Sequence, residues 1–192
     1  MNLDSLLRFV ALTHEFQKIE RKLYVAGLSR KENDVEHSYQ LALLAWYVVS
    51  TQKISLDVDK VIRYAMVHDF VEVFAGDTFF FGERSGKEER EREAALRLQK
   101  EYPEFSELHE WIAAYESKAD PESLFVYALD KVVPILNIYL DGGRTWKEHG
   151  ITFEQLFLNK QKVINEPRVR VLFDELMARL RDEAPSLFPE DR

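Results

Sequence analysis

The chain has no cysteine among its 192 residues, so it forms neither a disulfide nor a thiolate zinc site. Any metal that it binds must therefore use nitrogen and oxygen ligands. Its longest apolar stretches, 41–49 and 124–129, are much shorter than the roughly 18 residues that a membrane-spanning helix needs. These absences predict a cytoplasmic protein with no membrane partner.

The chain also lacks an excess of basic residues, since its net charge is −8 and its pI is about 5.2. Proteins that wrap duplex nucleic acid need a basic surface that displaces counterions, so we expect no such partner. A small anionic substrate would depend on a bound cation and on a few local Arg or Lys side chains.

Glycine and proline are scarce, with seven and six residues, and apolar residues recur at three- and four-residue spacing along most of the chain. This pattern predicts an all-α fold with no strand. We expect one domain over 1–192, with a core over about 5–142 and C-terminal helices over about 152–183. The expected helices cover 5–22, 33–51, 55–75, 87–102, 104–116, 121–140, 152–165 and 168–183, with a loop over 25–33.

Charged groups in the apolar segment AMVHDFVEVF suggest a functional site. Buried charge is costly unless it is paired or bound to a metal. In a continuous helix, His68, Asp69 and Glu72 can all face one cavity. The alternative for this segment alone is a solvent-facing rim on an amphipathic helix.

Two further residues in apolar helices fit the same site. His37 lies at the start of the helix VEHSYQLALLAW, where Glu36 could orient its second ring nitrogen. Asp130 lies within FVYALDKVVPIL, with Lys131 expected on another part of the turn. Two imidazoles and two carboxylates suit manganese, cobalt, zinc, nickel, iron or magnesium.

The order His37, then the adjacent His68 and Asp69, then Asp130 resembles the H…HD…D signature of the HD superfamily of helical metal-dependent phosphohydrolases. The stretches VEHSYQLALLA, MVHDFVEVFAGD and YESKADPESLFVYALDKV resemble the branch that contains the bacterial 5′-deoxynucleotidases. The resemblance covers about residues 5–142. It implies an HD-domain helical bundle around a central metal site.

The resemblance also implies roles for single residues. The divalent cation would be held by His37, His68, Asp69 and Asp130. Glu72 would act on the attacking water, and Asp77 would hold that water in line. Positions 116 and 122 match places that the family often fills with Glu, although both also suit helix ends here.

The sequence departs from the deoxynucleotidases at the phosphate-binding stretch, where the family has Arg followed by Trp. This chain has IERKLYVAG, so Arg21 or Lys22 would supply the positive charge and no Trp follows. The loop Phe79–Phe81 replaces an expected proline-containing loop. These rings could stack on a base, pack under a lid, fill the core or form a subunit interface.

The function implied is hydrolysis of (deoxy)nucleoside 5′-monophosphates by a cytoplasmic nucleotidase. Alternatives within the fold are a phosphodiesterase and a nucleotide pyrophosphohydrolase. The additional His residues typical of the first are not clustered here, and VHDFVEVFAGD lacks the ED pair that closely follows HD in guanosine tetraphosphate hydrolases. A non-catalytic metal-stabilised binding module is the alternative from another class. Aromatic residues around Phe79–Phe81 and Trp146 would suit a homodimer.

Overall fold

The computed structural model describes residues 2–82 and 85–189 of the chain. It is dominated by helices, as the sequence predicts, and it divides into two compact units. The first unit contains residues 1–21 and 32–123, and the second contains residues 22–31 and 124–192. The expectation of one domain over 1–192 stays a prediction.

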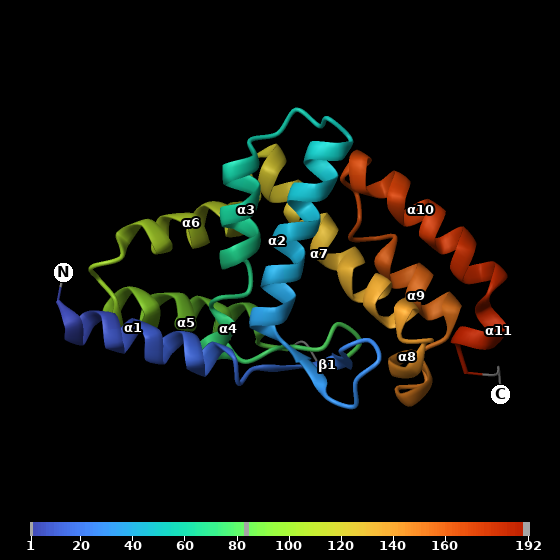
Figure 1. Ribbon diagram of the computed structural model, residues 1–192, viewed down its shortest axis with the longest axis horizontal. Coiled ribbons are helices and arrows are strands. Elements are labelled where there is room, and N and C mark those ends of the chain that lie inside the picture. The colour runs from blue at the N-terminus through green and yellow to red at the C-terminus, as the bar shows by residue number, and fades with distance from the viewer. Residues whose placement is uncertain (1, 83–84, 190–192) are drawn as a thin grey trace. The chain divides into compact units, whose positions relative to one another are not determined.

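In the described part of the chain, the helices of the first unit are α1 to α6, which Figure 1 labels. In this unit α2 packs on α3, α3 and α5 pack on α6, and α4 contacts both α1 and α5. Asn33 caps α2 through a reciprocal pair of hydrogen bonds with Glu36, and Asp57 caps α3. The helices are α1 (Leu3–Phe16), α2 (Asp34–Thr51), α3 (Val58–Val67), α4 (Glu72–Ala75), α5 (Lys87–Glu101) and α6 (Ser106–Ser117).

The first unit has an apolar core that α1, α5, α6 and the segment around α4 build together. Phe16 and Phe70 pack edge to face in it, with ring centroids 5.1 Å apart. The buried face of α1 is narrower than its apolar pattern suggests, because Leu6 and Val10 are exposed. The core residues are Leu12, Phe16, Phe70, Val71, Val73, Ala94, Leu98, Tyr102, Leu108 and Ile112.

The prediction that the chain has no strand is wrong, because β1 (Glu20–Tyr24) and β2 (Lys31–Asn33) pair as a two-stranded sheet. Helix α1 therefore ends at Phe16 instead of continuing to Lys22. The alternation in β1 is hidden in the sequence because the charged Arg21 shares the more buried side of the strand with the apolar Leu23. Pairing with β2 makes residues 20–24 a strand, and the local spacing of apolar residues does not encode such pairing.

As far as the structure describes it, the second unit contains most of α7 together with α8 to α11. Trp146 is almost fully buried and stacks on Phe188 at 4.5 Å, so the expectation that it is exposed at a subunit interface is wrong. A Cβ atom on Gly143 would lie 1.9 Å from the carbonyl oxygen of Leu187, which explains the glycine there. The helices are α7 (Pro121–Leu140), α8 (Arg144–Glu148), α9 (Phe153–Lys160), α10 (Pro167–Asp182) and α11 (Ala184–Leu187).

Among the described residues, α7 is the one helix that is long and apolar enough to cross a membrane by length and composition. Within its most apolar window, 56% of the residues are buried inside the protein. A core helix of this kind passes the same test. The sequence places Pro134 inside this helix, and the structure agrees.

Candidate metal centre

His68 lies directly after the last residue of α3 and is almost fully buried. Its Nδ1 lies 2.8 Å from the carbonyl oxygen of Ala65, one turn earlier. A carbonyl oxygen only accepts hydrogen bonds, so Nδ1 carries the proton and Nε2 presents a lone pair. That lone pair faces the Oδ2 atom of Asp69 at 2.9 Å.

His37 lies in the first turn of α2 and is completely buried. Its Nε2 lies 3.9 Å from Asp69 Oδ2, and its Nδ1 lies 3.9 Å from Glu32 Oε2. The sequence analysis expected Glu36 on the second ring nitrogen, but Glu36 completes the cap of α2. The carboxylate that faces Nδ1 belongs to Glu32, on β2.

One ligand atom from each of His37, His68 and Asp69 lies within 4.8 Å of the others, inside the first unit. The Nε2 atom of His68 and the carboxylate of Asp69 direct lone pairs toward each other at 2.9 Å. Such groups repel each other unless a proton or a cation lies between them. The donor set therefore fits a divalent metal ion with nitrogen and oxygen ligands.

The helix that was expected to run from 55 to 75 is interrupted at the site. Helix α3 ends at Val67, residues 68–71 form a turn, and α4 begins at Glu72. Helical spacing therefore does not align His68, Asp69 and Glu72 on one face. Glu72 belongs instead to a second acidic group, while His68 and Asp69 join His37.

The second group consists of Asp34, Glu72 and Asp77, whose oxygens lie within 4.8 Å of one another. Burial and the nearby charges of Asp69, Asp34 and Asp77 raise the pKa of Glu72 to about 10. Burial and Asp69 likewise raise the pKa of Asp34 to about 7. So many carboxylates in one place need positive charge, which a second cation could also supply here.

Arg21 supplies part of that positive charge from β1. Its Nη1 lies 3.0 Å from Asp69 Oδ2, 3.2 Å from Asp34 Oδ1 and 3.9 Å from Asp77 Oδ1. Of the two basic residues predicted to bind phosphate, Arg21 lies with the acidic groups. Lys22 is exposed, because successive side chains of a strand point to opposite faces.

Asp130 lies on α7, in the second unit, and its side chain is buried. Lys131 donates to Asp130 Oδ2 at 2.5 Å, so this carboxylate has an ionic partner that the sequence analysis did not expect. A buried carboxylate at this position is therefore not by itself a sign of a metal.

Three charged residues that lie near the site were not predicted from the sequence. They are Glu32, Asp34 and Lys87. Asp34 lies three residues before His37 and so on the same side of α2. That spacing could have revealed it. Glu32 and Lys87 have no comparable local signal, because β2 and the packing of α4 on α5 bring them in.

The remaining candidate residues lie elsewhere. His14 and His149 are exposed, and His109 Nε2 donates to the carbonyl oxygen of Tyr102. Glu122 accepts from the backbone of Asp57 and ion-pairs with Lys60, as a helix-end residue would. The rings of Phe79–Phe81 are partly buried and contact one another.

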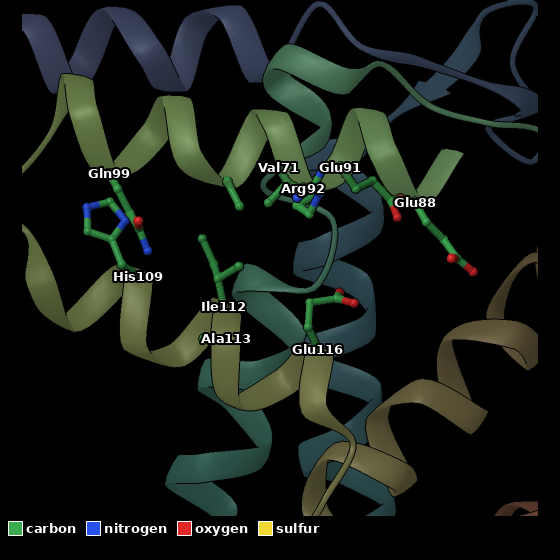
Figure 2. Close-up of a pocket in the computed structure, with 10 residues that line it drawn as sticks. Val71, Glu88, Glu91, Arg92, Gln99, His109, Ile112, Ala113 and Glu116 are labelled. Atoms are coloured by element: carbon green, nitrogen blue, oxygen red, sulfur yellow. The ribbon is translucent and has the colours of Figure 1, made fainter. Parts of the chain in front are cut away.

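A separate cavity of about 300 Å³ lies between α5 and α6 (Figure 2). Its lining includes apolar residues such as Val71 and Ile112 and carboxylates such as Glu91 and Glu116. None of the predicted metal ligands, nor Glu72 or Asp77, lines it. Position 116, which the family resemblance singled out, thus lies at this cavity.

The chain matches the model of one protein family, the HD domain, over residues 13–171. It is 31% identical over 137 residues to the 5′-deoxynucleotidase HDDC2 of Homo sapiens, a match that covers 69% of this chain and 66% of the relative. The chain thus spans about two thirds of the length of that curated relative.

Solved structures agree with this match. A predicted metal-dependent phosphohydrolase from Magnetospirillum magnetotacticum is 30% identical, with a TM-score of 0.81 over 97% of this chain and 98% of that one. The PH0347 protein of Pyrococcus horikoshii shares the fold, with 23% identity and a TM-score of 0.65 over 91% of this chain and 99% of that one. With a family model that matches most of its length and a site built on His37, His68 and Asp69, the chain belongs to the HD domain family.

Proposed function

We propose that the chain is a metal-dependent phosphohydrolase that releases phosphate from nucleoside 5′-monophosphates. The observation that carries the proposal is the convergence of His37, His68 and Asp69, whose electron-rich atoms lie within 4.8 Å of one another. The names of its relatives, a 5′-deoxynucleotidase and a metal-dependent phosphohydrolase, support the same reaction.

His37, His68 and Asp69 would hold the divalent ion, and the family resemblance adds Asp130 as a fourth ligand. Manganese, cobalt, nickel, zinc, iron and magnesium all suit such ligands. When bound, the ion would polarise a phosphoryl oxygen and favour ionisation of a water molecule. The contact between His68 Nδ1 and Ala65 keeps the other ring nitrogen, Nε2, directed at Asp69 for this purpose.

Glu72 and Asp77 would handle the proton of the attacking water. Both carboxylates lie together with Asp34, and Glu72 is buried to 2% exposure. The Oε2 atom of Glu72 has no hydrogen-bond partner among the described residues, so it is available to a water molecule. Burial keeps this carboxylate from being solvated by bulk water.

Arg21 would neutralise the remaining charge of the phosphate group. Its guanidinium presents five donors in a fork that matches phosphate oxygens. It already lies among Asp34, Asp69 and Asp77, so a phosphate at the metal would be within its reach. Lys22 does not share this role in the proposal, because its side chain is exposed on the other face of β1.

The sugar preference is expected to be weaker than in the deoxynucleotidases. The residue that follows Arg21 is Lys22, where the family resemblance leads us to expect Trp. Without that aromatic ring, discrimination against the ribose 2′-hydroxyl should fall. We therefore propose both ribo- and deoxyribonucleoside 5′-monophosphates as substrates.

The test is phosphate release from a panel of these monophosphates by metal-stripped protein that is then given each divalent ion in turn. Glu72→Gln should remove activity while metal content and melting temperature stay at the wild-type values. Glu110→Gln, an exposed glutamate on α6, is the matched control and should keep full activity.

Two other functions predict different results from the same panel. A phosphodiesterase or a nucleotide pyrophosphohydrolase would release a nucleotide or pyrophosphate from larger substrates and leave the monophosphates intact. A metal-stabilised binding module would bind the ion and turn over nothing. The placement of Glu72 and Asp77 beside the ligands favours an enzyme, because metal binding for stability alone needs neither.

We also propose that the chain forms a homodimer through α2. One side of this helix exposes large apolar side chains at helical spacing: Tyr39, Leu43, Trp46 and Tyr47. Exposed apolar patches on that scale commonly mark interfaces. Sedimentation of the wild-type protein should give a dimer and that of Trp46→Glu a monomer. A wild-type monomer at all concentrations would contradict the proposal.

A further inference from the structure

We propose that Lys87 is a positioning residue that holds the carboxylate of Glu72 for the reaction. This inference rests on the proposed role of Glu72 and adds to it a residue from α5. By its alternating charges alone, the run 87–102 would form a helix with a solvated surface. The described structure places the first residue of that run against the site.

The contacts of Lys87 define its role. Its Nζ atom lies 3.5 Å from Glu72 Oε1 and 3.0 Å from Glu91 Oε1. The side chain of Lys87 is 22% exposed, and that of Glu72 is 2% exposed. The ion pair with Glu72 is therefore largely shielded from solvent, where electrostatic attraction is strongest.

The position of Lys87 within α5 is unfavourable for the helix itself. Lys87 is the first residue of α5, and the positive end of the helix dipole disfavours a cation there. Glu88 and Glu89 in the same turn are the residues that stabilise a helix start. A lysine in this place is thus better explained by its acidic partners than by helix stability.

Lys87 also partly neutralises a local excess of negative charge around Glu72. Asp34, Asp69 and Asp77 all act on Glu72, and Arg21 contacts these three aspartates. Lys87 brings a positive charge to within 3.5 Å of Glu72 Oε1. It would keep Oε1 fixed while Oε2, which has no hydrogen-bond partner among those residues, faces its proton donor.

The contact with Glu91 offers a second explanation for the position of Lys87, and the experiment must distinguish it from the first. It lies one turn after Lys87 on α5 and lines the cavity between α5 and α6 (Figure 2). If Lys87 only anchors the first turn of α5 through Glu91, then loss of either residue should act through stability. If Lys87 positions Glu72, loss of Glu91 should matter little.

The experiment compares Lys87→Met, Lys87→Arg and Glu91→Gln, with Lys100→Met on the exposed last turn of α5 as the control. For Lys87→Met we expect kcat to fall about 10- to 100-fold while KM stays within about twofold. Lys87→Arg should restore most of kcat, and the other two variants should match wild type. Metal content should be unchanged in all four, and only Lys87→Met, which leaves the buried Glu72 without this cation, should lower the melting temperature.

A second readout needs no turnover. In protein with ¹³C-labelled glutamate side chains, the Glu72 carboxyl signal is identified by its loss in Glu72→Gln. It should shift in Lys87→Met and stay in place in Lys100→Met. This separates the two proposals: a wild-type protein that is inactive on the whole panel refutes the proposed function, whereas an unmoved carboxyl signal refutes the role of Lys87.

Other results would also overturn the role of Lys87. A rise in KM with unchanged kcat would show that the lysine contacts the substrate phosphate and does not act through Glu72. A loss of kcat in Glu91→Gln equal to that in Lys87→Met would show a structural anchor. A kcat equal to wild type in Lys87→Met would show that Lys87 does not contribute to the reaction.

Discussion

At the scale of single residues, the site depends on the balance between its carboxylates and the positive charge of Arg21. Arg21 is one guanidinium within 4 Å of carboxylates from four residues, which are Glu32, Asp34, Asp69 and Asp77. Its own side chain is 11% exposed. Removal of one partner from a buried ionic group leaves uncompensated charge, which costs more than the pair contributes.

Replacement of Arg21 by Gln should therefore destabilise the metal-free protein at neutral pH. The expected loss is about 3 to 5 kcal/mol of unfolding free energy, the usual cost of an unpaired buried charge. Urea denaturation measures it. Arg92→Gln, which breaks an exposed ion pair with Glu89, is the control and should leave the midpoint unchanged. Equal midpoints for wild type and Arg21→Gln would contradict the charge-balance account.

At the scale of elements, the break between α3 and α4 shapes the site. The turn at 68–71 carries His68 and Asp69, and α4 then ends after one turn at Gly76. Gly76 has φ +74° and ψ 150°, a conformation that L side chains rarely adopt. Its amide donates to the carbonyl oxygen of Glu72, and Asp77 follows directly. The glycine thus sets the direction in which Asp77 leaves the helix.

Replacement of Gly76 by Ala should cost about 1 to 3 kcal/mol, the usual strain of such a backbone conformation. Space is not the cause, because a Cβ atom would meet nothing within 4 Å. We expect kcat to fall as well, since relaxed backbone would move Asp77. Gly150→Ala, at φ +63° and far along the chain, should lose stability but keep kcat. Unchanged activity in Gly76→Ala would show that Asp77 needs no such support.

The start of α7 gives a prediction about pH. Burial raises the pKa of Asp120, but hydrogen bonds from Lys60, the Ser123 amide and Tyr64 outweigh it and lower that pKa to about 2. A carboxylate with a lowered pKa stabilises the fold above its unfolded pKa. That stability is lost as the pH falls from about 4 towards about 2.

Asp120→Asn should therefore be less stable than wild type at pH 7. This gap in unfolding free energy between the two proteins should shrink below about pH 4. Urea midpoints for both proteins between pH 7 and pH 3 measure the gap. Asp59→Asn, which changes an exposed aspartate on α3, is the control and should lie closer to wild type at pH 7 than Asp120→Asn does. A gap that stays constant down to pH 3 would mean that the ionised carboxylate contributes nothing beyond its hydrogen bonds.

At the scale of the whole molecule, the proposed ligand set spans residues 37 to 130 of the sequence. His37, His68 and Asp69 belong to the first unit, and Asp130 belongs to the second. A metal that binds the folded chain and not the unfolded one adds its binding free energy to stability. Metal binding should thus be visible in global unfolding.

Metal at about 100 times its Kd should raise the free energy of unfolding by about 2.7 kcal/mol, and a chelator should reverse the change. Thermal unfolding with and without manganese measures it. If Asp130 is a ligand, Asp130→Asn should weaken metal affinity at least about tenfold. Asp59→Asn should bind as wild type does. Wild-type affinity in Asp130→Asn would remove Asp130 from the ligand set.

Much of this protein follows from its sequence alone. Apolar spacing and caps predict helices such as α2 and α5 nearly to the residue, because those signals are local. The order of His37, His68, Asp69 and Asp130 predicts the family, which the family model confirms over residues 13–171. The roles of Glu72 and Asp77, the cytoplasmic location and the homodimer stay predictions.

Tertiary structure alone decided the rest. The strand that carries Arg21 depends on its pairing with β2, and the carboxylate that faces His37 Nδ1 at 3.9 Å belongs to Glu32 on that second strand. The contact of Lys87 with Glu72 depends on the packing of α4 against α5. Local spacing fixes which face of a helix is apolar, whereas these charge pairs join residues far apart in sequence and form only when the chain folds.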